Sequence, residues 1–180
     1  MKGVIFTELL EMAEGALSPE VVEEVIAAAD LESGGAYTSI GTYPFSELQA
    51  LIVAFASRME APVPEVLRGF GGHLFQAFQR SHSAFFTDVR DTFDLLRRVE
   101  DEIHVEVRKL YPDAELPTFA CSEPILGDLI LEYRSTRGLA DLAAGLLDAT
   151  IAHFGESIAV ERQDLSGGQN THVVFTLRRA

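Results

Sequence analysis

The chain has 180 residues, 47% hydrophobic and 23% charged, which is enough to bury the core of one domain. Its 14 basic and 28 acidic residues give a formal net charge of −14, which argues against nucleic acid or an anionic membrane as a partner. A single cysteine, Cys121, excludes an internal disulfide framework and multi-cysteine metal sites. Because apolar runs are too short to span a bilayer and no signal-peptide pattern is present, we expect one cytoplasmic domain over residues 1–180.

Apolar residues at helical spacing predict four helices in the first half of the chain, over about 3–14, 19–30, 47–59 and 64–78. Ser18 and Ser46 are the expected N-caps of the second and third helices. The glycine-rich stretch 33–44 predicts a loop. Gly71 and Gly72 lower the stability of the fourth helix, so we expect another backbone or a ligand to approach closely there.

The second half changes from helical to alternating patterns. The expected elements are a long helix over about 91–110, a strand over about 125–133, a helix over about 139–154, and two strands over 158–165 and 171–177 that form a hairpin. This order predicts an α+β fold in which an N-terminal helical part, about 1–65, packs on a part with an antiparallel sheet and helices, about 66–180.

Two patterns carry candidate chemistry. His104 lies at the border of the apolar face of the long helix, where a hydrogen-bonded structural histidine is more common than a metal ligand. Tyr133, Ser135 and Arg137 alternate at the end of a strand and so point the same way if the backbone stays extended. A phenol, a hydroxyl and a guanidinium on one side suit a carboxylate, although a solvated strand end is the simpler interpretation of one short pattern.

Taken together, these patterns make the chain similar to the H-NOX (haem-nitric oxide/oxygen binding) family, in its bacterial stand-alone form. The resemblance covers nearly the whole chain and depends on segments that occur in the family's order: Met1-Lys2-Gly3, Gly35-Ala36-Tyr37-Thr38 to Gly41-Thr42-Tyr43, Phe70-Gly71-Gly72-His73-Leu74-Phe75, the block from His104 to Pro117, and Tyr133-x-Ser135-x-Arg137.

The resemblance implies the H-NOX fold and a haem b cofactor with His104 as the only protein ligand to the iron. Tyr133, Ser135 and Arg137 match the residues that hold the porphyrin propionates, and Pro117 matches the residue that presses on the macrocycle. By family position the expected pocket-wall residues are Ile5, Leu74, Phe78, Leu142 and Leu146.

The resemblance also bears on gas selectivity. Leu142 occupies the position of the distal tyrosine in oxygen-binding relatives, and Leu9 and Leu74 stand where its polar partners would be. Bound oxygen gains more from a hydrogen-bond donor than nitric oxide or carbon monoxide does, so we expect a sensor of NO and CO that excludes oxygen. Tyr37 or Tyr43 could still supply such a donor.

The function implied is a switch without turnover. Nitric oxide bound opposite His104 should weaken the iron–histidine bond and let the haem relax against Pro117, and the signal should pass to a separate protein such as a histidine kinase or a cyclic-di-GMP enzyme. No zinc site is expected, since the cysteine positions of zinc-binding relatives hold other residues, among them Ala140. A metal site at His153 and His172 is less favoured than structural roles for both. The alternatives are a haem enzyme or carrier, or a haem-free interaction domain of the same fold.

Overall fold

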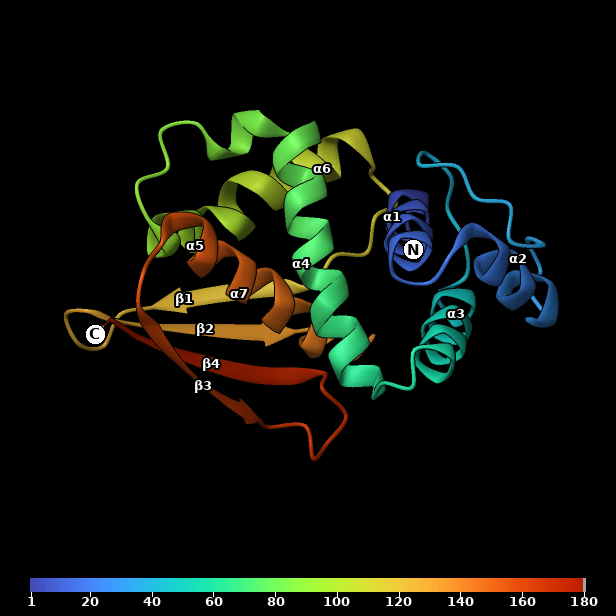
Figure 1. Cartoon of the computed structure of the whole chain (residues 1–180). Coiled ribbons are helices and arrows are strands. Elements are labelled where there is room, and N and C mark those ends of the chain that lie inside the picture. The colour runs from blue at the N-terminus through green and yellow to red at the C-terminus, as the bar shows by residue number, and fades with distance from the viewer. Residues whose placement is uncertain (180) are drawn as a thin grey trace.

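The computed structural model describes residues 1–179 as a helical N-terminal half followed by a sheet with further helices (Figure 1). The elements are α1 (Gly3–Ala16), α2 (Pro19–Ala28), α3 (Phe45–Arg58), α4 (Val63–Ser81), a 3-10 turn (Ser83–Phe86), α5 (Thr92–Arg98), a π-helical turn (Val99–Ile103), α6 (His104–Leu110), β1 (Thr118–Ser122), β2 (Asp128–Arg134), α7 (Ala140–Phe154), β3 (Ile158–Asp164) and β4 (His172–Arg179). No helix in the described part of the chain is long and apolar enough to cross a membrane.

The four strands form one antiparallel sheet in the order β1-β2-β4-β3, which confirms the predicted α+β class. The hairpin of β3 and β4 was expected. The strand predicted from about residue 125 begins later, at Asp128, because Ile125 and Leu126 are exposed in the preceding turn. Strand β1 was not predicted, and its register pairs Phe119 with Tyr133 of β2.

Local signals set some helix ends and not others. The Ser18 side chain accepts a hydrogen bond from the backbone N–H of Val21 and so caps α2 as predicted. The prediction that Ser46 caps the third helix was wrong, since α3 begins at Phe45 directly after Pro44. The long helix predicted over 91–110 is also divided, because a π-helical turn separates α5 from α6.

Buried apolar side chains gather in two clusters on either side of α4 and α7. The first cluster lies among α1 to α4, at the right of Figure 1, and includes Phe6, Leu9, Phe55, Phe70 and Leu74. The second lies between one face of the sheet and the helices α5 and α7. Because α4 contributes to the first cluster and packs along α7, these two helices join the halves, and the division near residue 65 remains a prediction.

Gly71 lies at the point where α4 and α7 cross. A Cβ at this position would overlap the carbonyl oxygen of Leu142 and would lie 2.8 Å from the Cα of Gly145. The expected close approach of another backbone is therefore confirmed for Gly71. A Cβ on Gly72 would meet nothing within 4 Å, so no other backbone approaches Gly72.

Candidate functional site

His104 is the first residue of α6 and is buried, with 9% of its surface exposed. Its Nδ1 donates a hydrogen bond to Oε2 of Glu100 over 2.9 Å, and its Nε2 has no hydrogen-bond partner among residues 1–179. Burial lowers the pKa of His104 below its usual value, although the hydrogen bond to Glu100 acts in the opposite direction. The imidazole is therefore neutral near pH 7, as a metal-binding histidine must be.

The Glu100 carboxylate receives three hydrogen bonds. Besides the bond from His104, Nη2 of Arg108 donates to Oε1 over 2.7 Å and the backbone N–H of Phe119 donates to Oε2 over 3.1 Å. Burial acts to raise the pKa of Glu100, but these three hydrogen bonds lower it more. The result is an ionised carboxylate that links α6 to strand β1.

The ring of Phe119 connects His104 with the predicted carboxylate-binding residues. Its centroid lies 5.8 Å from that of His104 and 5.6 Å from that of Tyr133. The phenol oxygen of Tyr133 accepts a hydrogen bond from the backbone N–H of Leu139 over 3.1 Å, and burial raises the pKa of Tyr133. Oγ of Ser135, next along this segment, accepts a hydrogen bond from the backbone N–H of Arg137 over 3.2 Å.

Arg137 holds a carboxylate in this structure. Its guanidinium pairs with the side chain of Glu115 and donates to the backbone carbonyl of the same residue. The Arg137 side chain is only 12% exposed, whereas that of Glu115 is 78% exposed. Glu115 and the half-buried Pro117 belong to the segment between α6 and β1, so this segment contacts Arg137 at one end and leads to Phe119, beside His104, at the other.

The predicted pocket-wall residues gather apart from His104, in the first hydrophobic cluster. Leu74 is buried there together with Leu9. The partly buried wall residues that pack against the same cluster are Ile5, Phe78, Leu142 and Leu146. The predicted site residues therefore form two groups. One is apolar and comes from α1, α4 and α7, and the other is polar and lies around His104 and Arg137. Leu139, which packs on the first cluster and donates to Tyr133, connects them.

Comparison with known proteins identifies the chain. The family model described as "Haem-NO-binding" matches residues 2–162. The chain belongs to the H-NOX family. H-NOX domains bind haem and sense diatomic gases, and members of the family are sensor domains.

Solved H-NOX structures show the same fold over the whole chain. The Fe(II) unliganded H-NOX protein from K. algicida is 36% identical with a TM-score of 0.93, covering 100% of this chain and 97% of its own. The H-NOX protein from S. oneidensis in the Fe(II)NO state is 27% identical with a TM-score of 0.89, and coverage is 100% and 99%. The H-NOX from Shewanella woodyi, bound to IWP-051 in the Fe(II)CO state, is 38% identical with a TM-score of 0.85 and coverage of 100% and 95%. No curated protein matches the chain significantly.

The residues of this H-NOX domain fit a haem on two observations. A buried neutral imidazole with an unpartnered Nε2 is the donor that haem iron takes from a protein. Arg137 already binds a carboxylate, which is the chemistry that a propionate requires. Both belong to the sequence-predicted site, whereas Glu100 was not predicted. Its position four residues before His104 on a helical segment was a signal that could have found it.

Neither tyrosine of the N-terminal loop directs its hydroxyl into the apolar wall group of the H-NOX domain. The hydroxyl of Tyr37 donates to Oε2 of Glu47 over 2.6 Å, and that of Tyr43 accepts a hydrogen bond from the backbone N–H of Thr38 over 2.8 Å. Both tyrosines pack around Phe6, with ring centroids at 4.4 and 5.4 Å. The Tyr37 hydroxyl is therefore bound to the first turn of α3, and the Tyr43 hydroxyl is bound within the loop.

The other four histidines of the H-NOX domain have local partners. Nε2 of His73 lies 3.0 Å from Glu8, and Nδ1 of His82 lies 2.7 Å from Oγ of Ser81. The two histidines considered as a metal pair have separate partners, which are Gln79 for His153 and Glu132 for His172. Among the described residues, the group that could hold a metal through histidine and carboxylates is instead His73 with Glu8 and Glu11.

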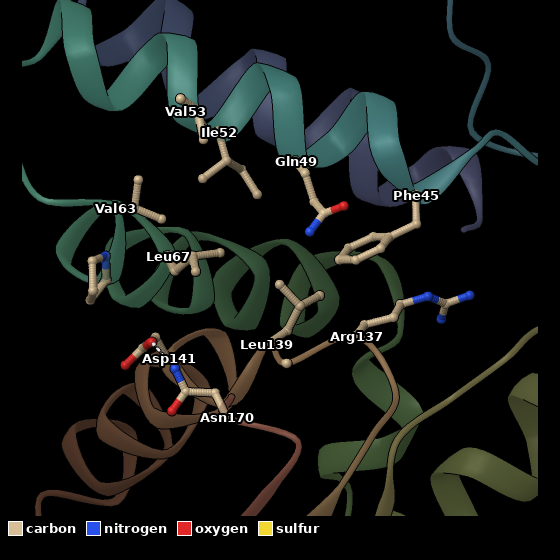
Figure 2. Close-up of a pocket in the computed structure, with 12 residues that line it drawn as sticks. Phe45, Gln49, Ile52, Val53, Val63, Leu67, Arg137, Leu139, Asp141 and Asn170 are labelled. Atoms are coloured by element: carbon tan, nitrogen blue, oxygen red, sulfur yellow. Dashed lines mark hydrogen bonds between the residues drawn. The ribbon is translucent and has the colours of Figure 1, made fainter. Parts of the chain in front are cut away.

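A cavity of about 230 Å³ lies outside the predicted haem site, between α3, α4 and the segment after β2 (Figure 2). Figure 2 shows Leu139 facing Leu67 and Phe45 across it, while the guanidinium of Arg137 extends away from Asp141. Drug-sized ligands occupy pockets of about 300–1,000 Å³, so this cavity is too small for a porphyrin. It shares only Arg137 with the predicted site.

Proposed function

We propose that this H-NOX domain is a sensor of nitric oxide and carbon monoxide that uses haem b and does not form a stable complex with oxygen. His104 would be the only protein ligand to the iron. The observation that carries the proposal is the state of this side chain, which is buried and neutral, with Nδ1 occupied by Glu100 and Nε2 without a partner among residues 1–179.

The remaining cofactor contacts follow from the donor set. When bound, the haem supplies the iron at which the gas binds. Arg137, with Tyr133 and Ser135 beside it, would hold the propionates in place of the exposed Glu115 carboxylate. Pro117 would press on the macrocycle. The apolar side chains Ile5, Leu74, Phe78, Leu142 and Leu146 would line the pocket and exclude water.

The proposed selectivity depends on the absence of a hydrogen-bond donor at the distal wall. Leu9, Leu74 and Leu142 have no side-chain donor. The hydroxyls of Tyr37 and Tyr43 are already bonded, to Glu47 of α3 and to the backbone N–H of Thr38. Oxygen on haem iron depends on such a donor more than carbon monoxide or nitric oxide does. These residues therefore favour NO and CO.

The proposed output is a change of packing between the two halves of the chain. His104 begins α6, and Glu100 ties that helix to β1, so a change at His104 reaches the sheet directly. A separate signalling protein, such as a histidine kinase or a cyclic-di-GMP enzyme, would bind one state more tightly than the other. By linkage the same partner would alter the affinity for the gas.

The test is an absorption spectrum of the protein reconstituted with haem and reduced. We expect one haem per chain, spectral changes with NO and with CO, and no spectrum of a stable oxygen complex in air. Failure to bind haem would contradict the proposal as a whole. A stable complex with oxygen would contradict the selectivity, and steady turnover of peroxide would favour the haem-enzyme alternative.

A further inference from the structure

The function proposed so far uses the carboxylate beside His104 only as a link between α6 and β1, and gives it no effect on the bond to the iron. Glu100 lies in the π-helical turn Val99–Ile103, four residues before His104, and accepts a hydrogen bond from its Nδ1 over 2.9 Å. The side chains are 26% and 11% exposed, so the pair is largely shielded from water. Such a bond is electrostatically stronger than one in open solvent.

We infer that Glu100 is a positioning residue that sets the tautomer of His104 and strengthens the donation from its Nε2 to the haem iron. This inference rests on the proposed function. A carboxylate can only accept at Nδ1, so the proton stays there and the lone pair stays on Nε2. A carboxylate on the second ring nitrogen also makes a histidine ligand more basic.

The other hydrogen bonds of Glu100 fix the position of its carboxylate beside His104. Oε2, which accepts from His104, also accepts from the backbone N–H of Phe119 over 3.1 Å, and Oε1 accepts from Arg108 over 2.7 Å. The carboxylate therefore cannot turn away from His104 without losing another hydrogen bond. The Arg108 guanidinium is 41% exposed and balances the charge from the solvent side. The carboxylate is thereby held in one orientation toward the imidazole.

The same contacts give Glu100 a second effect, on release of α6. The Phe119 backbone belongs to β1, whereas His104 begins α6, and Glu100 is hydrogen-bonded to both. Any displacement of His104 away from β1 must stretch one of these two bonds. Glu100 therefore both strengthens the bond from His104 to the iron and resists displacement of His104. Both effects raise the free energy needed to operate the proposed switch.

The first arm of the test needs no haem. Nitrogen-15 NMR of the histidine side chains in the haem-free protein should show the Nδ1–H tautomer for His104 in the wild type. In Glu100→Leu, which removes the acceptor, we expect loss of that preference. An Nε2–H tautomer in the wild type, or an unchanged tautomer in Glu100→Leu, would overturn the inference.

The second arm uses the reduced haem-loaded protein. The iron–histidine stretching band in the resonance Raman spectrum should move to lower frequency in Glu100→Gln and further in Glu100→Leu. Haem transfer from Glu100→Leu to an acceptor apoprotein should be about 10–100-fold faster than from the wild type. Equal bands in all three proteins would contradict the inference.

The matched control is Asp101→Asn, which removes one negative charge from the same π-helical turn at an exposed side chain. Asp101→Asn should leave both the His104 tautomer and the Raman band unchanged. If it changes them as much as the Glu100 variants do, the effect is one of general charge, and the inference is refuted. If the wild type binds no haem, the proposed function fails, but the NMR arm still decides whether Glu100 sets the tautomer. Glu100→Gln keeps the side-chain shape and covers the case in which Glu100→Leu does not fold.

Discussion

Gly71 of α4 and Gly145 of α7 meet where the two helices cross, and a Cβ on Gly71 would lie 2.8 Å from the Cα of Gly145. A Cβ on Gly145 would overlap the backbone carbonyl oxygen of Arg68. Since backbone cannot move aside as a flexible side chain can, both positions require glycine. The crossing joins the helical half to the sheet-containing half, and its closeness determines how the predicted wall residues of α4 and α7 face each other.

Gly145→Ala should therefore destabilise the protein by about 1–3 kcal/mol, the usual cost of overpacking. Gly72→Ala is the matched control, because its Cβ would meet nothing within 4 Å and alanine favours a helix by up to about 1 kcal/mol. Chemical denaturation of the variants measures both. Equal stability of Gly145→Ala and the wild type would show that the helices can move apart without cost.

Features that depend on local sequence were predictable. The helices of the first half, the β3–β4 hairpin and the Ser18 cap follow from apolar spacing and turn chemistry, and Gly71 was recognised as a close approach. Strand β1 was not predictable, because four of its five residues are exposed and it shows no apolar alternation. Its strand geometry comes from pairing with β2, which is a tertiary effect.

The site was predictable to a similar degree. His104 and the trio Tyr133, Ser135 and Arg137 were singled out from their patterns in the sequence. The resemblance supplied their roles, which remain predictions. The π-helical turn before His104 leaves no mark in apolar periodicity, so a continuous helix was expected over 91–110. The hydrogen bond from His104 to Glu100 was missed with it, since the interpretation of His104 considered only its apolar neighbours.

The Glu47 carboxylate predicts a dependence of stability on pH. Glu47 is buried and accepts hydrogen bonds from Ser33 and Tyr37; burial acts to raise its pKa, but these bonds lower it below the usual 4.5. Its contribution is therefore present above about pH 4.5 and is lost as pH falls through the folded pKa. Burial, with Glu47 beside it, raises the pKa of Tyr37 from 10 to about 12, so stability also falls between these values.

Thermal denaturation across pH tests this account. Glu47→Gln should cost about 1–3 kcal/mol at neutral pH and should flatten the acid limb of the stability profile. Tyr37→Phe should flatten the alkaline limb. An acid limb of the same steepness in Glu47→Gln would assign the effect to other carboxylates.

Arg137 is expected to determine how long the protein retains haem. In Arg137→Met the charge-assisted hydrogen bonds to a carboxylate are lost, and haem transfer to an acceptor protein should be about 10–100-fold faster. Arg134→Met is the control, because Arg134 forms an exposed ion pair with Glu132 that contributes little. Equal retention by the two variants would remove Arg137 from the proposed propionate site.

The distal wall can be tested by adding a donor. Leu142→Tyr places a phenol at the position proposed to lack a donor, so the reduced variant should show the spectrum of a stable oxygen complex in air. Leu142→Phe adds a ring without a hydroxyl and should not. An oxygen complex in Leu142→Phe, or in the wild type, would show that selectivity does not depend on a hydrogen bond at this position.

Direct assignment of the iron ligand comes from the spectrum of reduced, haem-loaded His104→Gly, recorded with and without added imidazole. We predict that the variant loses the wild-type spectrum. The spectrum should return when added imidazole fills the space left by the side chain. A spectrum and gas response in His104→Gly that match the wild type without imidazole would contradict this prediction, because another residue would then bind the iron.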